Sequence, residues 1–145
     1  MYYFDTSFLV PFFVDEPTST RVEQFLKRQP KELATISQWT CIEFSAAIAR
    51  LVRIGRMTTD RATTVESTFD SLAIESFLMI SPTSKDFELA RRFLRRYESG
   101  LRSGDALHLA IASNHDARAI YSLDRGFLKA GQLLGLPVES GIRLP

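Results

Sequence analysis

The feature that most constrains the fold of this chain is the alternation of short apolar segments with longer segments of helical periodicity. Strands are expected at the short apolar segments, which are residues 2–4, 33–37, 77–80, 119–122 and 136–139. Strands that alternate with helices form a parallel sheet with helices on both of its faces. The sequence therefore predicts an α/β fold with a central parallel sheet of about four or five strands.

Helices are expected between these strands, where apolar residues recur every three or four positions. The predicted helices cover residues 6–14, 18–29, 38–53, 58–73, 84–97, 105–115 and 127–134. Those at 38–53 and 105–115 are apolar on most faces, which predicts that both are buried. The helix at 84–97 is amphipathic, and its predicted apolar side carries Phe87, Ala90, Leu94 and Tyr97.

Length and composition indicate an ordinary globular protein. The 145 residues suit one domain, expected to span residues 1–145, and the formal net charge of +1 does not by itself indicate a nucleic-acid binder. The single cysteine, Cys41, excludes an internal disulfide. The first apolar run, residues 8–14, is too short to span a membrane and lacks the basic leader of a signal peptide. We therefore expect a cytoplasmic protein without a membrane partner.

Four acidic residues lie next to apolar elements rather than on solvated faces. Asp5 and Asp124 follow predicted strands, whereas Glu43 and Asp105 lie near the starts of the two apolar helices. Strand ends and the helix starts that follow them share one edge of a parallel sheet, so the four carboxylates are expected to converge there. Converging carboxylates repel one another unless a cation holds them, and Mg²⁺ or Mn²⁺ prefers oxygen ligands.

Each acid also has a purely structural interpretation. Asp5 can cap the following helix, Asp105 can be a first-turn helix acid, and Asp124 can be a turn residue. Glu43 is the hardest to explain structurally, because it lies inside a helix with apolar neighbours on both sides. The coincidence of four such acids favours a functional site.

The sequence contains no competing catalytic set. It has no Gly-rich phosphate loop, and a single cysteine cannot support a zinc cluster. Of the two histidines, His108 lies three residues after Asp105 and is expected to be a core residue or to lie behind the site.

With these residues in place, the chain resembles the PIN-domain ribonucleases, in particular the toxins of VapBC-type toxin–antitoxin pairs. The resemblance rests on residues 5–7 (Asp-Thr-Ser), 40–44 (Thr-Cys-Ile-Glu-Phe), 101–110 (Leu-Arg-Ser-Gly-Asp-Ala-Leu-His-Leu-Ala) and 122–127 (Ser-Leu-Asp-Arg-Gly-Phe). The order, the spacing and the total length agree, and residues 101–110 are the most specific. Ser122 stands where the family usually has threonine, which keeps the hydroxyl.

The resemblance implies a PIN-like three-layer α/β/α sandwich and a Mg²⁺- or Mn²⁺-dependent endoribonuclease, commonly a homodimer, that an antitoxin protein blocks. Asp5, Asp105 and Asp124 are then expected to hold the metal. Glu43 is expected to complete the metal shell through a water, or to orient and deprotonate the attacking water. The hydroxyls expected to orient the carboxylates are those of Thr6, Ser7 and Ser122.

RNA binding is expected from a local concentration of basic residues. These residues are Arg91, Arg92, Arg95, Arg96 and Arg102. A solvated helix face balanced by nearby acids is the favoured interpretation for Arg91 and Arg95. Arg102, three residues before Asp105, is the better candidate for contacting an RNA phosphate, followed by Arg96.

Two other functions are compatible with these residues. A phosphatase with Asp5 as the covalent nucleophile usually needs a second acid two residues later, where this chain has Ser7. A catalytically degenerate PIN-like module would bind RNA or a protein without cutting, but the presence of all four acids argues against it.

The first predicted helix also suggests an interaction surface. Its large apolar side chains are those of Phe8, Leu9, Phe12 and Phe13. We hypothesise that part of this surface, with the helix around Val65 and Phe69, packs on a second copy or on an antitoxin segment. An antitoxin arginine could then pair with the carboxylates.

Overall fold

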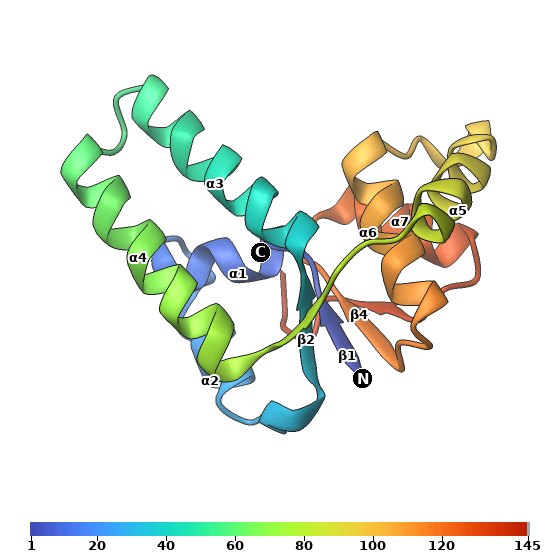
Figure 1. The fold of residues 1–145 in the computed structure, drawn as a ribbon, viewed down its shortest axis with the longest axis horizontal. Helices are drawn as coiled ribbons and strands as arrows, with labels where there is room; N and C mark the ends of the chain where they lie inside the picture. Colours follow the sequence, from blue (N-terminus) through green and yellow to red (C-terminus); the bar gives the residue numbers. More distant parts are fainter. Residues whose placement is uncertain (145) are drawn as a thin grey trace.

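The computed structural model describes residues 1–144, apart from the side chain of Lys31, and contains a central sheet (Figure 1). Its strands are β1 (Tyr2–Phe4), β2 (Ala34–Ser37), β3 (Leu78–Ile80), β4 (Ala119–Tyr121) and β5 (Val138–Glu139). Their order is β3-β2-β1-β4-β5, and each neighbouring pair is parallel. The predicted parallel sheet is confirmed.

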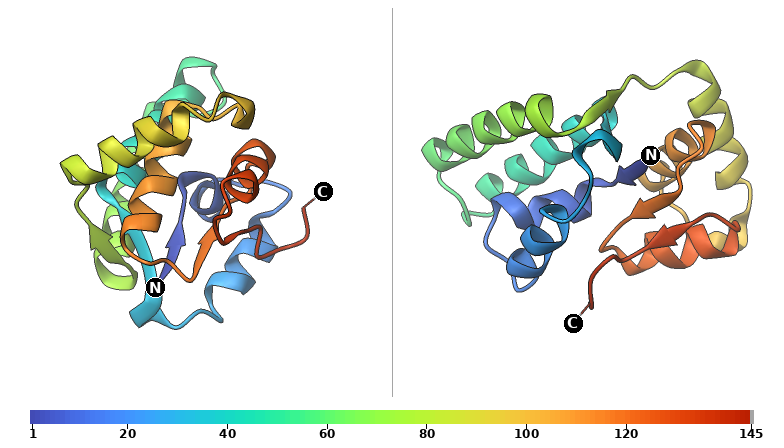
Figure 2. Two further views of the ribbon diagram at one scale, coloured as in Figure 1. Left: turned by 90° about the vertical axis from the view of Figure 1, so that its right-hand side faces the viewer. Right: turned by 90° about the horizontal axis from the view of Figure 1, so that it is seen from below.

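Helices cover both faces of this sheet. They are α1 (Thr6–Phe13), α2 (Ser19–Leu26), α3 (Gln38–Arg53), α4 (Thr59–Ser76), α5 (Ser84–Leu94), α6 (Ser103–Asn114) and α7 (Arg125–Leu133), with 3-10 turns η1 (Lys31–Leu33) and η2 (Tyr97–Ser99). Figure 2 shows α1 to α4 on one side of the strands and α5 to α7 on the other. None of the helices in residues 1–144 is both long and apolar enough to cross a membrane.

The alternation of side chains along the strands produces two separate cores. Successive residues of a strand point to opposite faces of the sheet. Phe4 and Tyr121 accordingly join the core formed with α1, α2, α3 and α4, while Tyr3 and Ile120 join the core formed with α5, α6 and α7. This arrangement is the predicted three-layer α/β/α sandwich.

The two apolar helices differ in their burial. In α6 every residue from 106 to 112 is buried, as predicted. In α3 only Thr40, Phe44 and Ile48 are buried, and the side chain of Ile42 is 59% exposed, so the prediction of a buried α3 is wrong. The reason is that α3 pairs with α4 in a hairpin that extends past the sheet (Figure 1), so helices cover only part of its surface.

The helix predicted at 84–97 ends earlier than expected. It stops at Leu94, and the chain continues through η2 to Gly100, whose φ of 65° is in the left-handed region that glycine favours. Tyr97 is therefore 86% exposed, and Phe87 is also exposed, so both were wrongly assigned to an apolar face. The chain has to reverse after Leu94 because α6 packs back against α5.

Most of the apolar surface expected on α1 is used inside the molecule. Phe8 and Leu9 are buried, and the ring of Phe13 packs edge-on against the rings of Phe44 and Phe69. The predicted contributors Val65 and Phe69 in α4 are buried as well. The large side chains of α1 are therefore needed for the contacts of α1 with α2, α3 and α4, and this surface is mostly unavailable to a partner.

Candidate functional site

The candidate site lies at the carboxyl edge of the sheet, where the strand order reverses. From β1 the chain first builds outward through β2 and β3, and β4 then returns to the other side of β1. Ligands of open parallel sheets bind at such a reversal. Asp5 follows β1 and Ser122 follows β4, and the backbone N–H of Asp5 donates to the carbonyl of Tyr121 at 3.1 Å.

Asp5 and Asp124 each cap a helix. Asp5 Oδ1 accepts from the N–H of Phe8 in α1 at 3.2 Å. Asp124 Oδ1 accepts from the N–H groups of Gly126 at 2.6 Å and Phe127 at 3.0 Å, at the start of α7. The structural interpretation of Asp5 as a helix cap is therefore correct, whereas Asp124 caps α7 and is not the turn residue that the sequence suggested, because α7 already begins at Arg125. Either cap is compatible with a functional role, because capping by Oδ1 does not require Oδ2.

Asp5 is held in a buried position. Its side chain is 4% exposed, and burial raises the pKa of the carboxyl to about 6, against the opposing influence of His108 and of the hydrogen bonds from Ser7 and Phe8. The Ser7 hydroxyl donates to Asp5 Oδ1 at 2.8 Å and lies 3.2 Å from the Ser122 hydroxyl. The Ser7 hydroxyl therefore contacts Asp5 directly, and Ser122 lies next to Ser7.

Glu43 reaches the same edge from the second turn of α3. Its Oε2 lies 2.7 Å from His108 Nε2 and accepts from the Thr6 hydroxyl at 3.0 Å. Partial burial favours a higher pKa for the Glu43 carboxyl, but its hydrogen bond with His108 and a smaller contribution from that of Thr6 hold this pKa below its ordinary value. The Thr6 hydroxyl thus contacts Glu43.

Asp105 lies in the first turn of α6, near both Asp124 and Glu43. Burial raises the pKa of the Asp105 carboxyl, and the negative charges of Asp124 and Glu43 raise it further, while His108 and Arg102 oppose this shift. The helices that carry Glu43 and Asp105 contact each other beside the strand ends (Figure 1). The structure thus brings the acids found in the sequence to one edge of the sheet.

The chemistry of these donors fits a hard divalent cation. Within residues 1–144, no three Asp, Glu, His or Cys side chains lie close enough together to hold an ion as they stand. The aspartates nevertheless offer only oxygen ligands, Asp5 bears the cost of a buried charge, and Asp105 is repelled by its neighbours. A cation among them would relieve both penalties, so the residues present fit such an ion.

Sequence reasoning missed three residues that surround Glu43 and His108. The Tyr3 hydroxyl lies 2.7 Å from His108 Nδ1. The indole nitrogen of Trp39 is buried without a hydrogen-bond partner in the described part of the chain, and a Cβ at Gly104 would collide with Glu43 Oε1. The sequence spacing could have indicated two of them. Tyr3 precedes Asp5 by two positions, which share one face of an extended segment, and Trp39 precedes Glu43 by four, which share one face of a helix.

The two arginines expected to bind RNA have different surroundings. Arg102 is exposed at the start of α6, close enough to lower the pKa of the Asp105 carboxyl. The guanidinium of Arg96 forms an exposed ion pair with Glu98, with Nε and Oε1 2.7 Å apart. Arg102 therefore lies at the candidate site, whereas Arg96 is held by a local partner.

A sheet of this order with acids at its carboxyl edge corresponds to a described family. The family model named PIN domain matches residues 2–133. The chain belongs to the PIN domain family. The matched region of this PIN domain includes all four acids and the helices that carry them.

Individual PIN proteins give more specific comparisons. This PIN domain is 38% identical over 69 residues to ribonuclease VapC13 of Mycobacterium tuberculosis. The matched residues make up 46% of this chain and 50% of that protein. The match therefore spans about half the length of this relative. In structure it resembles VapC20 of the same organism, a toxin that cleaves the sarcin–ricin loop, with a TM-score of 0.73 and 19% identity over 90% of this chain and 95% of the other. It also resembles FitAcB from Neisseria gonorrhoeae, with a TM-score of 0.76 and 16% identity over 97% and 98%. These two likenesses show the fold.

Proposed function

We propose that this PIN domain is a Mg²⁺- or Mn²⁺-dependent endoribonuclease and the toxin of a VapBC-type toxin–antitoxin pair. The observation that carries the proposal is the gathering of acids at one edge of the sheet, where Asp5 is buried and Asp105 is repelled by Asp124 and Glu43. The match to ribonuclease VapC13 and the fold shared with the VapC20 toxin support RNA as the substrate.

The residues proposed to hold the metal are Asp5, Asp105 and Asp124. When bound, a divalent cation makes a water nucleophilic at neutral pH and stabilises charge that develops on the phosphate. The Ser7 hydroxyl keeps Asp5 oriented by donating to its Oδ1, and the N–H of Leu123 donates in turn to Ser7 at 2.9 Å. The Ser122 hydroxyl accepts from the N–H of Asp124 at 3.1 Å and so fixes the turn that presents this acid.

Glu43 is proposed to orient the attacking water and to accept its proton. Its lowered pKa keeps the carboxylate ionised at neutral pH, and it enters the site from a different element than the aspartates. Arg102 is proposed to hold an RNA phosphate beside Asp105, because it is exposed at the mouth of the site. Arg96 is proposed to add a weaker phosphate contact, since it is already paired with Glu98.

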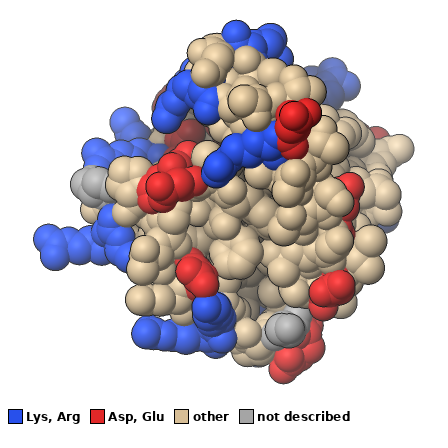
Figure 3. Space-filling view, turned by 90° about the vertical axis from the view of Figure 1, so that its left-hand side faces the viewer, with Lys and Arg blue, Asp and Glu red and all other residues tan. Residues whose placement is uncertain are grey.

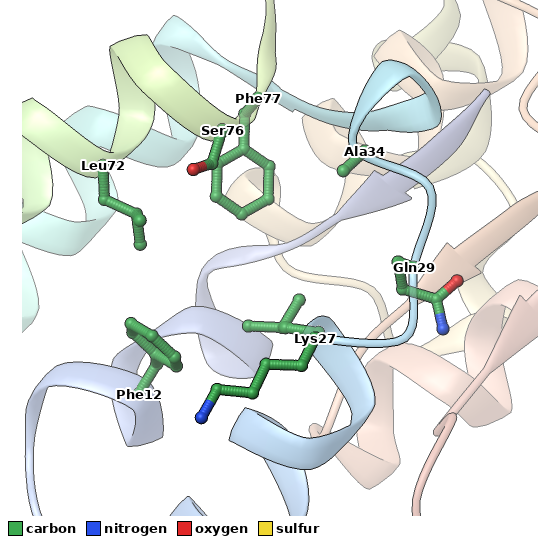
Figure 4. A pocket seen from close by; sticks show the side chains of 8 residues that line it. Phe12, Lys27, Gln29, Ala34, Leu72, Ser76 and Phe77 are labelled. Atoms are coloured by element: carbon green, nitrogen blue, oxygen red, sulfur yellow. The ribbon is translucent and has the colours of Figure 1, made fainter.

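The proposed protein partner is an antitoxin that docks on the side of the molecule that carries α4. Acidic and basic side chains are scattered over this face, with uncharged areas between them (Figure 3). Beside it, α1, α2 and α4 enclose a hollow of about 180 Å³. Figure 4 shows Phe12, Leu72 and Phe77 around this hollow, with Lys27 along one side. Such a hollow has space for an apolar side chain of a bound segment. An arginine of that segment would form ion pairs with the carboxylates of the candidate site.

We also propose that the protein is a homodimer and acts in the cytoplasm. Apolar side chains exposed on α3, β3 and α5 support a second copy as a partner; they are Ile42, Leu78, Met79 and Phe87. The edge strand β3 is a further reason, because an uncovered strand edge favours association. A single unpaired thiol, Cys41, suits a reducing compartment. Sedimentation that shows only monomers at high concentration would contradict the dimer.

The nuclease proposal is tested by incubating the purified chain with a structured RNA in Mg²⁺, in Mn²⁺, and in excess chelator. We expect internal cleavage with either metal and none with the chelator. Asp5→Asn and Asp105→Asn should be inactive in all three conditions.

Two controls make this experiment decisive. Asp116→Asn removes an exposed acid from the turn after α6 and should leave cleavage unchanged. Gel-shift binding of the same RNA detects the alternative, a degenerate module. A folded wild-type protein that binds RNA without ever cutting it would replace the nuclease proposal with that alternative.

A further inference from the structure

His108 is buried deep inside the site, and both of its ring nitrogens are engaged. Its side chain is fully buried in the middle of α6. Nε2 lies 2.7 Å from Glu43 Oε2 and 3.3 Å from the Thr6 hydroxyl, and Nδ1 lies 2.7 Å from the Tyr3 hydroxyl. A buried polar side chain with two short hydrogen bonds is fixed in orientation. His108 therefore links the strand β1 to an acid carried by α3.

We propose that His108 is a positioning residue that sets the place of the Glu43 carboxylate, and that Tyr3 in turn fixes the His108 ring. This inference rests on the proposed function, in which Glu43 acts on the attacking water. It adds that hydrogen bonds through Tyr3 and His108 connect the Glu43 carboxylate to β1, the central strand of the sheet, and fix the position of this carboxylate.

The chain continues from Tyr3 into the start of α3. The Tyr3 hydroxyl lies 2.8 Å from the Ser37 hydroxyl, and the Ser37 hydroxyl lies 3.3 Å from that of Thr40. These partners determine where we assign the protons. The Thr40 hydroxyl donates to Ser37, the Ser37 hydroxyl to Tyr3, and the Tyr3 hydroxyl to His108 Nδ1. The Nε2–H group of His108 then donates to Glu43. Every polar atom in this sequence of bonds then has a partner.

This chain of hydrogen bonds has no outlet to water at its far end. The side chains of Tyr3, Ser37 and Thr40 are all fully buried. A proton taken up by Glu43 could not leave through them to solvent. The chain is therefore suited to holding a side chain in place and not to carrying protons away from the site.

Glu43 is also confined from its other side. Its Oε1 lies against Gly104 so closely that a Cβ there would collide with it, and the ring of Trp39 lies 3.7 Å from the same Cβ position. The Thr6 hydroxyl holds Oε2 together with His108. Glu43 thus has one position that satisfies contacts from α1, α3 and α6 at once.

The experiment compares four variants of the full chain, with Glu43→Gln as a further reference for the fluorescence measurement. His108→Leu removes both ring nitrogens, His108→Gln keeps one N–H donor, and Tyr3→Phe removes a single oxygen. His115→Gln is the matched control, because His115 is an exposed histidine at the end of the same helix, with Nδ1 2.9 Å from the Ile111 carbonyl.

Steady-state RNA cleavage is the first measurement. We expect His108→Leu and Tyr3→Phe to lower kcat by about 10- to 100-fold, the range seen when groups behind a ligand are removed, with KM nearly unchanged. His108→Gln should recover part of the loss, since an amide N–H can still donate to Glu43. His115→Gln should match the wild type.

Trp39 fluorescence is the second measurement, and it does not depend on catalysis. Trp39 is the sole tryptophan of the chain, and its indole lies beside the Glu43 carboxylate. We expect His108→Leu and Tyr3→Phe to change its emission in the same direction as Glu43→Gln does. The His115→Gln spectrum should be that of the wild type.

These outcomes separate the two proposals. If folded Tyr3→Phe and His108→Gln show wild-type emission and wild-type kcat, the positioning role of His108 is wrong, even if His108→Leu fails to fold. If the wild type never cuts RNA but both variants shift Trp39 emission as Glu43→Gln does, the positioning of Glu43 stands and the nuclease proposal fails.

Discussion

At the scale of single residues, Asp5 combines a structural and a chemical task in one carboxylate. Oδ1 accepts hydrogen bonds from Ser7 and from the N–H of Phe8, which fixes the start of α1. The same carboxylate is almost completely buried, so its charge is costly in the absence of a cation. The capping role thus positions the acid, while burial leaves its charge poorly compensated.

Replacing Asp5 separates these two tasks. Asp5→Asn keeps an oxygen that can cap α1 but removes the charge. We expect cleavage to be abolished, while the melting temperature of the metal-free protein stays the same or rises. If Asp5 were mainly one half of a buried ion pair, the variant would instead be destabilised by about 3–5 kcal/mol. Parallel assays of RNA cleavage and thermal unfolding in chelator decide between these outcomes.

The raised pKa of Asp5 also predicts a pH dependence of stability. The folded-state pKa of about 6 exceeds the ordinary value of 3.8, so the native state binds more protons than the unfolded state between these values. The free energy of unfolding should therefore fall as pH rises from about 4 to about 6, by on the order of 2–3 kcal/mol from this group.

Urea unfolding in chelator at pH 4 and pH 7 measures this effect. Asp5→Asn is the reference, because the other acids titrate in both proteins. The wild type should lose more stability between the two pH values than Asp5→Asn does. Equal losses would show that burial of Asp5 has no such cost.

At the scale of elements, the site depends on how closely α3 approaches the first turn of α6. Gly104 has an ordinary helical backbone, so it is needed for space and not for a positive φ. A side chain there would meet Glu43 Oε1. The glycine thus allows an acid from one helix to rest on the first turn of another.

Gly104→Ala should therefore displace Glu43. Alanine is favoured over glycine in a helix by about 1 kcal/mol, which offsets part of the collision. We expect a large loss of cleavage with a small change in melting temperature. In a Glu43→Ala background the collision is gone, and Gly104→Ala should then be stabilising. A double-mutant cycle of unfolding free energies tests this coupling, and additive effects would contradict it.

At the scale of the whole molecule, the acids lie where the two cores meet. Glu43 projects from α3, which contributes Phe44 to one core and Trp39 to the margin of the other. Asp105 projects from α6, whose buried residues belong to the second core. A ligand bound among the acids would therefore join the two halves and act on global stability.

We accordingly expect divalent metal to raise the melting temperature of the wild type. Binding only to the native state adds about 2.7 kcal/mol when the free metal is a hundredfold above its dissociation constant. Scanning calorimetry with increasing Mn²⁺ measures this shift, which should shrink in Asp5→Asn. A control titration with the same concentrations of K⁺ should give no comparable shift. An unchanged melting temperature in saturating Mn²⁺ would contradict the proposed metal site.

Local features of the sequence were sufficient to predict the parallel sheet and the places of Asp5 and Asp124. Asp5 lies directly between a short apolar segment and a helix start, and Asp124 lies in the short connection between β4 and the start of α7. In a parallel sheet this junction has one location, the carboxyl edge, whatever the rest of the chain does. Strand ends can therefore be placed on that edge without knowing the tertiary structure.

Tertiary structure alone decided which apolar helix is buried and what surrounds Glu43. Helices α3 and α6 have similar apolar patterns, but α6 is enclosed by its neighbours whereas α3 extends past the sheet with Ile42 exposed. Tyr3 and His108 are 105 positions apart, and His108 and Glu43 are 65 apart. Contacts at such separations depend on how whole elements pack, because no local periodicity specifies which side chains meet across two helices and a strand.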